Sequence, residues 1–351
     1  MHNRRAAFLC KTLRMRVGLL TLFAAIATPS HAQSPEKFYK DRQLKFIVGS
    51  AGGGGYEFYS RLLTRHMTRF IPGNPRFVIQ YMPGAGGVIA SNYLFNVAPQ
   101  DGSEIGMVGR ATATQTLLQP DNTAVKFAPR EFKWIGSPQQ EVGLLIVRLP
   151  SPVNLITDLK KHEVILSGTG RMAPPSFYPR VMNGLLGTKF KVVEGYKSSQ
   201  EALLALERGE VSGHSSGSSA GPLRERIGPW VKAGQVKVVA QIGMERDSAF
   251  SDVPTVLELA ETDEQRAVLR LLFAQQVLAW PIVAPPKTPA DRVDALRLAF
   301  DRSVTDVDFL VVAKKTGLLI NPVSGKAADE FLTEVYKTPD DIVSATRKLM
   351  Q

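Results

Sequence analysis

The chain has 351 residues, of which 44% are hydrophobic and 21% charged, and its formal net charge is +11. This length is too great for one comfortable hydrophobic core, so two domains are expected. The basic residues are scattered, without a run of five or more and without interleaved aromatic residues, which argues against a nucleic-acid-binding protein.

The N-terminus has the pattern of a signal peptide. Five basic residues and no acidic residue lie in the first sixteen positions, the apolar run VGLLTLFAAIA follows at 17–27, and TPSHAQ ends with small residues before a cleavage site. The apolar run is shorter than the roughly 20 residues of a membrane anchor. We expect cleavage after Ala32, with the Sec and Tat export routes both open. Cys10, the only cysteine, would be removed, so the mature chain would form no disulfide.

Two strand–loop–helix units come next. LKFIVGS (44–50) and RFVIQYM (76–82) are expected strands, AGGGGYE (51–57) and PGAGG (83–87) are glycine loops, and apolar residues at helical spacing follow each loop. A third strand, EIGMVGR, is expected to end at Arg110. Such repeated units predict a parallel sheet in an α/β fold. Later strands are expected at 144–147, 164–166, 192–193 and 236–241.

A helix is expected near residue 290. Thr288 and Asp291 have the spacing of a capping box, with Pro289 at the first helical position. Val293, Leu296 and Phe300 would then form its apolar stripe.

The glycine loops indicate an anion site. Each loop lies between a strand and a helix, where the first backbone N–H groups of the helix are unpaired and the helix dipole is positive. Glycine lets the backbone approach a ligand, and two such loops at the carboxyl edge of a sheet suit an anion. The alternative is that the glycines only make tight turns.

Enzyme motifs are incomplete. PGAGGVI has Ile89 where a dinucleotide-binding loop needs its third glycine, and Gly325-Lys326 lacks the rest of a phosphate-binding loop. GHSSG (213–217) matches a nucleophile elbow around Ser215, but no histidine follows it, as an α/β-hydrolase would require. His66 is expected to be a helix-face residue. With three histidines and no cysteine after residue 32, we expect no catalytic metal site and no cofactor.

Six ordered blocks resemble the Bug family, the receptors of tripartite tricarboxylate transporters. The blocks are GSAGGGGYEFYSRLL, PGAGGVIASNYL, VAPQDGSEIGMV, EGYKSSQEALLALERGEV, FSDVPTVLEL and WPIVAPPKTPADRVDALRLAF. The resemblance implies a type II periplasmic-binding-protein fold of two α/β lobes with the ligand between them. The chain would cross between the lobes near Gln140 and near Val239. The segments would be a signal peptide (1–32), the first lobe (33–140), the second lobe (141–238) and a return to the first lobe (239–351).

The same resemblance implies the ligand-binding residues. From the two lobes these are Gly53, Gly54, Tyr56, Glu57, Gly84, Ala85, Gly86 and Gly87, then Ser167, Gly168, Thr169, Gly170 and Arg171. Two positions depart from the family pattern. Tyr56-Glu57 stands where many relatives have Thr-Asp, and Ser216, which we include in the ligand set, stands where many have an acidic residue.

Arg110 is a candidate from the residues alone. It directly follows the expected third strand, so its guanidinium could pair with a ligand carboxylate through two parallel hydrogen bonds. The alternative is a solvated surface arginine. With Ser216 in place of an acid and Arg171 nearby, we expect a ligand without a free amino group, such as a dicarboxylate or an aromatic acid.

The sequence therefore favours a monomeric periplasmic binding protein that hands a small organic carboxylate, either a di- or tricarboxylate or an aromatic acid, to integral membrane transporter subunits. A sensory receptor is an alternative within the same class of protein. A periplasmic serine hydrolase using Ser215 is the alternative from another class.

Overall fold

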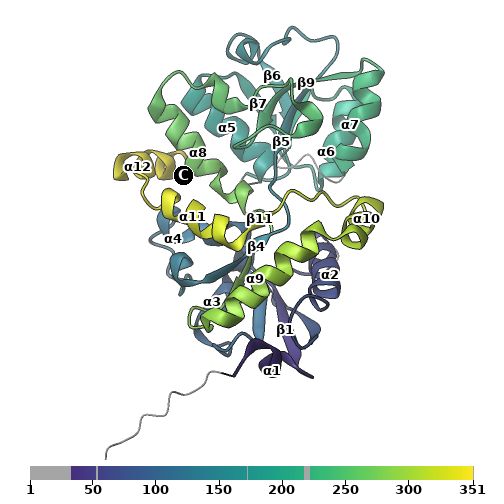
Figure 1. Cartoon of the computed structure of the whole chain (residues 1–351). Helices are drawn as coiled ribbons and strands as arrows, with labels where there is room; N and C mark the ends of the chain where they lie inside the picture. Colours follow the sequence, from purple (N-terminus) through teal and green to yellow (C-terminus); the bar gives the residue numbers. More distant parts are fainter. Residues whose placement is uncertain (1–32, 53, 172, 217–221, 351) are drawn as a thin grey trace, which may run out of the picture. The chain divides into compact units, whose positions relative to one another are not determined.

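The computed structural model describes residues 33–52, 54–171, 173–216 and 222–350, with helices and strands labelled as in Figure 1. The predicted signal peptide, its cleavage site after Ala32, the loop residue Gly53 and Gly217 of the GHSSG motif lie outside these ranges. The described strands form two separate sheets, and we call each sheet with its covering helices a lobe.

The first sheet has the strand order β11-β4-β10-β3-β1-β2. The end of the sheet formed by β3, β1 and β2 is parallel, because β1 pairs in parallel with both β2 and β3. This confirms the α/β fold predicted from the repeated units. The returning strand β10 is antiparallel and lies between β3 and β4. The strands are β1 (Gln43–Val48), β2 (Arg76–Tyr81), β3 (Glu104–Met107), β4 (Lys133–Ser137), β10 (Ile282–Ala284) and β11 (Val323–Ser324).

The second sheet has the order β7-β6-β8-β5-β9. Here β6 is parallel to β7 and β8, whereas β5 pairs antiparallel with β8 and β9. The strands are β5 (Gly143–Arg148), β6 (Val164–Ser167), β7 (Phe190–Val193), β8 (Gly213–Ser215) and β9 (Val236–Ile242).

The helices alternate with the strands over most of the chain, except that β4, β5 and β6 follow one another without an α-helix between them. They are α1 (Pro35–Tyr39), α2 (Gly55–Met67), α3 (Val88–Asn96), α4 (Gln115–Leu118), α5 (Pro174–Leu186), α6 (Ser199–Arg208), α7 (Pro222–Lys232), α8 (Asp263–Val277), α9 (Ala290–Thr305), α10 (Val307–Lys315), α11 (Gly325–Val335) and α12 (Asp340–Leu349).

Two predicted boundaries differ from the structure. The third strand ends at Met107, and Arg110 begins a short 3-10 helix instead. Helix α9 begins at Ala290 after Pro289, and the predicted capping box does not form, because the Thr288 hydroxyl donates a hydrogen bond to the Pro285 carbonyl. The predicted apolar stripe of α9 is buried all the same.

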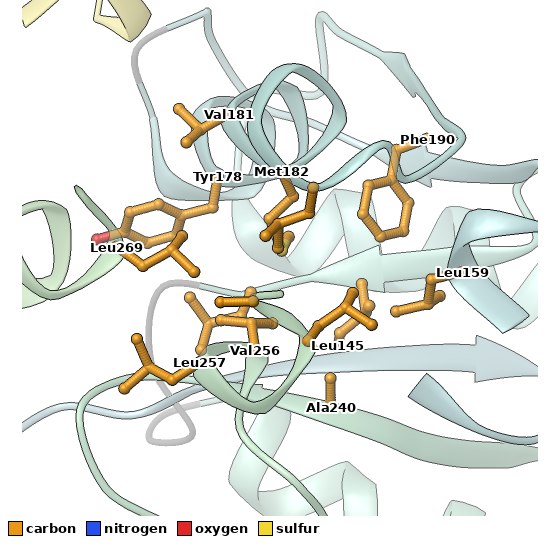
Figure 2. Packing of buried hydrophobic residues seen from close by; sticks show 14 of the residues in the cluster. Leu145, Leu159, Tyr178, Val181, Met182, Phe190, Ala240, Val256, Leu257 and Leu269 are labelled. Atoms are coloured by element: carbon orange, nitrogen blue, oxygen red, sulfur yellow. The ribbon is translucent and has the colours of Figure 1, made fainter. Parts of the chain in front are cut away.

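The second lobe takes residues from more of the chain than we expected. Figure 2 shows Val256, Leu257 and Leu269 packed with Leu145 and Ala240 of this sheet. The strand near Val239 therefore does not leave the lobe, and the chain returns to the first sheet only after α8. Helix α12 also joins this core through Ile342. Gln140, where the first crossing was predicted, lies between β4 and β5.

Candidate functional site

Three loops meet at the carboxyl edge of the first sheet, after β1, β2 and β3. A Cβ atom built on Gly87 would lie 2.5 Å from the backbone nitrogen of Gly109, and one on Gly49 would lie 3.3 Å from the Cα of Gly87. These glycines are therefore needed so that the loop backbones can touch each other. Gly49 and Gly87 thus have a structural role, which agrees with the alternative that glycines of these loops serve the backbone and not a ligand.

Other glycines of the same loops face open space. A Cβ atom at Gly54 or Gly86 would meet nothing within 4 Å, and Gly86 has a φ of +65° that side chains disfavour. Gly54 precedes α2, and no side chain caps the first turn of that helix. The N–H groups at a helix start, beside uncovered backbone, suit an anion. Gly84 and Ala85 also have positive φ angles within the second loop.

Tyr56 and Glu57 lie in the first turn of helix α2, and both have partners in the protein. The Tyr56 ring makes an edge contact with Trp280, with centroids 4.7 Å apart. Burial raises the pKa of the Tyr56 hydroxyl, and the positive charge of Arg110 opposes this shift. The Glu57 carboxylate accepts a hydrogen bond of 2.6 Å from the Nε of Arg61. Neither side chain is a free surface group.

Arg110 is paired with an acidic residue that the sequence reasoning missed. Its Nη1 donates a hydrogen bond of 2.6 Å to Oε2 of Glu141, and its guanidinium lies 5.7 Å from the Trp280 ring centroid. The Arg110 side chain is 30% exposed, whereas that of Glu141 is only 5% exposed. Arg110 is thus neither fully solvated nor an unpaired cation. Glu141 directly follows the predicted crossing at Gln140, which was the only available signal for it.

Tyr178 brings the second lobe close to this pair. Arg110 and Glu141 both act electrostatically on the Tyr178 hydroxyl, whose pKa is raised to about 12, chiefly by burial. The ring of Tyr178 packs edge-on against Phe273 of helix α8. Arg110 and Glu141 therefore influence the charge state of a buried side chain of the second lobe.

The predicted residues of the second lobe divide into two groups. Ser167 is fully buried, with its Oγ 2.9 Å from Nδ1 of His214, and the Ser216 Oγ accepts a hydrogen bond of 2.8 Å from the Leu144 backbone. Their hydroxyls are thus engaged within the sheet. Thr169 and Gly170 are half-buried and Arg171 is exposed. In the described part of this lobe, residues 169–171 are the predicted ones that keep accessible surface.

Ser215 lacks the surroundings of a nucleophile. Its hydroxyl is buried and has no hydrogen-bond partner among the described residues. The neighbouring His214 turns its Nδ1 to Ser167 instead, and burial lowers the pKa of His214 to about 4. The Nδ1 of His66 in helix α2 lies 3.3 Å from an oxygen of Asp306, the N-cap residue of α10.

The described residues contain no group of three or more His, Cys, Asp and Glu side chains that could hold a metal ion. None of the helices in these ranges has the length and apolar character needed to cross a membrane.

A cavity of about 320 Å³ lies beside the connections between the lobes. Glu141 lines it, but none of the ligand-binding residues predicted from the sequence does. The cavity is formed by residues 139–142, 244–248, 276–277 and 319–321.

Comparisons with known proteins agree with this architecture. Residues 71–346 match the tripartite tricarboxylate transporter family receptor, TctC. A Cupriavidus necator protein described as "UPF0065 protein in gbd 5'region" is 23% identical over 299 residues, which are 82% of this chain and 83% of that protein.

Solved structures show the same fold. A TctC solute-binding protein from Polaromonas, without ligand, has a TM-score of 0.68 at 18% identity, covering 89% of this chain and 99% of that one. MatC from Rhodopseudomonas palustris with bound malate has a TM-score of 0.55 at 20% identity, covering 88% and 99%. Another R. palustris protein, with adipate, has a TM-score of 0.58 at 19% identity, covering 88% and 97%. The chain belongs to the tripartite tricarboxylate transporter receptor family, and it is a solute-binding protein of two lobes rather than an enzyme.

Proposed function

We propose that this receptor captures a small dicarboxylate or aromatic acid between its lobes and delivers it to the membrane subunits of a tripartite tricarboxylate-type transporter. The observation that carries the proposal is the uncovered backbone at Gly54 and Gly86 beside an uncapped helix start. Backbone N–H groups in this position are donors for a carboxylate. The neighbouring structures with malate and with adipate show that this fold accommodates such ligands.

The two lobes would take different parts in binding. In the first lobe, Gly54 and Gly84 to Gly87 would bind one carboxylate through the backbone, with Arg110 beside these loops. In the second lobe, Thr169, Gly170 and Arg171 would contact the other end of the ligand, because their surface is accessible. Ser167 and Ser216 would support this end from behind through their bonds to His214 and Leu144.

We also propose where the protein acts. Receptors of this family are periplasmic, and the basic and apolar pattern of residues 1–32 suits export followed by cleavage after Ala32. The mature protein would act as a monomer, with one ligand bound between its two lobes.

Calorimetric titration of the mature protein tests the binding proposal. The probes are malate, adipate, citrate, benzoate and the zwitterion alanine. We expect saturable binding of at least one dicarboxylate or aromatic acid and no binding of alanine. Tight binding of alanine with no response to any of the acids would contradict the proposal.

A further inference from the structure

The cation best placed to meet a ligand carboxylate is already balanced by a carboxylate of the protein. Arg110 donates to Glu141 over 2.6 Å, and the acid is almost completely buried while the guanidinium keeps one accessible face. Burial by itself would lower the pKa of Arg110, but the Glu141 carboxylate outweighs it and raises that pKa above its usual value. A ligand approaching Arg110 therefore meets a pair with no net charge.

The geometry keeps the two partners together. The backbone N–H of Glu141 donates to the Gln276 carbonyl over 2.8 Å, and that of Gln140 donates to the Asn321 carbonyl over 3.0 Å. These bonds tie the first connection between the lobes to two other segments. On the other side, the Arg110 guanidinium lies 5.7 Å from the Trp280 ring centroid. Glu141 thus stays beside Arg110 when a ligand arrives, and it repels every further negative charge brought there.

We infer that Glu141 is a specificity-determining residue, which limits the part of the ligand beside Arg110 to a single carboxylate. A linear dicarboxylate can place its second charge away from Glu141, in the second lobe, and an aromatic acid has no second charge. A compact tricarboxylate such as citrate brings several charges close to Glu141, where repulsion is weakly screened. This inference rests on the proposed carboxylate binding and narrows it to a class of ligand.

The Glu141→Gln substitution tests the inference, because glutamine keeps the size and an acceptor for Arg110 but removes the charge. Calorimetry on the mature protein with benzoate, adipate and citrate gives three affinities for each variant. We expect the variant to bind citrate at least about tenfold more tightly than the wild type does. The affinity for benzoate should change less. The ratio of the citrate affinity to the benzoate affinity should therefore be higher in the variant than in the wild type.

Glu104→Gln is the matched control. Glu104 is also a buried acid in an ion pair, bonded to Lys45 over 2.7 Å, but it begins β3, whereas the glycine loops follow the strand ends. This substitution should leave all three affinities unchanged. If it shifts them as Glu141→Gln does, the effect is a general consequence of net charge and the inference is wrong.

The remaining outcomes are also decisive. Unchanged relative affinities in a folded Glu141→Gln variant would overturn the inference and leave the proposed function intact. If the variant does not fold, the affinities of the wild type still test the inference. The wild type must then bind adipate or benzoate about tenfold more tightly than citrate. A wild type that prefers citrate contradicts it. Failure of the wild type to bind any carboxylate would instead refute the proposed function.

Discussion

His214 lies in strand β8 of the second lobe, and its burial controls its charge. The side chain is almost fully enclosed and pairs with Ser167 through Nδ1. Desolvation penalises the protonated imidazole, so the pKa of His214 falls to about 4. The residue next to the supposed nucleophile is therefore a neutral structural group.

The pH dependence of stability should report this histidine. In the unfolded chain His214 protonates near pH 6.5, whereas the folded protein keeps it neutral down to about pH 4. The unfolded state thus binds more protons in this window, and His214 should remove about 3 kcal/mol of stability as the pH falls from 7.5 to 4. Urea unfolding should show a shallower pH dependence for His214→Asn. If the free energy of unfolding depends on pH in the same way in both proteins, the imidazole of His214 is not held neutral by burial.

The Arg110–Glu141 pair should also contribute to stability. Arg110→Ala leaves the Glu141 carboxylate buried without its partner, which should cost about 2–4 kcal/mol in the free energy of unfolding. The double variant Arg110→Ala/Glu141→Gln removes the unpaired charge and should recover part of that loss. Urea denaturation of the three proteins measures both effects. If the double variant is no more stable than Arg110→Ala, the unpaired charge of Glu141 is not the cause of the lost stability.

At the scale of elements, the second glycine loop combines two tasks in adjacent residues. Gly87 lets the loop touch the backbone of Gly109, whereas Gly86 faces open space. Both have positive φ angles, so any side chain adds strain at either position. The difference between the two residues is what the added methyl group would meet.

Two alanine substitutions separate these tasks. Gly86→Ala should cost only about 1–2 kcal/mol of stability, because its methyl group meets no protein atom. It should weaken the binding of a carboxylate at least about tenfold if the ligand approaches this backbone. Gly87→Ala should lower the melting temperature further, because its Cβ would lie 2.5 Å from the Gly109 nitrogen. Unchanged affinity in Gly86→Ala would show that the ligand does not approach this backbone and that the loop is only a turn.

At the scale of the whole molecule, the lobes are built from segments that are far apart in the chain. Helix α8 joins the core of the second lobe before β10 returns to the first sheet, and α12 contributes Ile342 to the second lobe again. Three separate connections therefore join the lobes, and Glu141 lies on the first.

Export is the prediction that concerns the whole chain. When the full sequence is produced with secretion into a periplasm, we expect a mature protein that starts at Gln33. Intact-mass measurement of the periplasmic fraction checks the cleavage site. A full-length species retained in the membrane fraction would contradict it.

The sequence by itself determined the local architecture. The strand–glycine–helix units after β1 and β2 were predictable because apolar spacing and glycine preference act over a few neighbouring residues. The strands β4, β8, β10 and β11 were not predicted. Three of them, β8, β10 and β11, are only two to three residues long, so their sequences carry no periodic signal. They form because neighbouring strands pair with them.

Only the tertiary structure decided what the candidate residues touch. Arg110 was identified from its place after a strand, but its partners Glu141 and Trp280 are 31 and 170 positions away, and no local pattern connects them. Ser167 and Ser216 have side chains that could face either a ligand or the sheet, and the packing of β6, β8 and β5 turned them toward His214 and Leu144. Charge balance within a site is a property of groups brought together by the fold, so it cannot be derived from the order of residues.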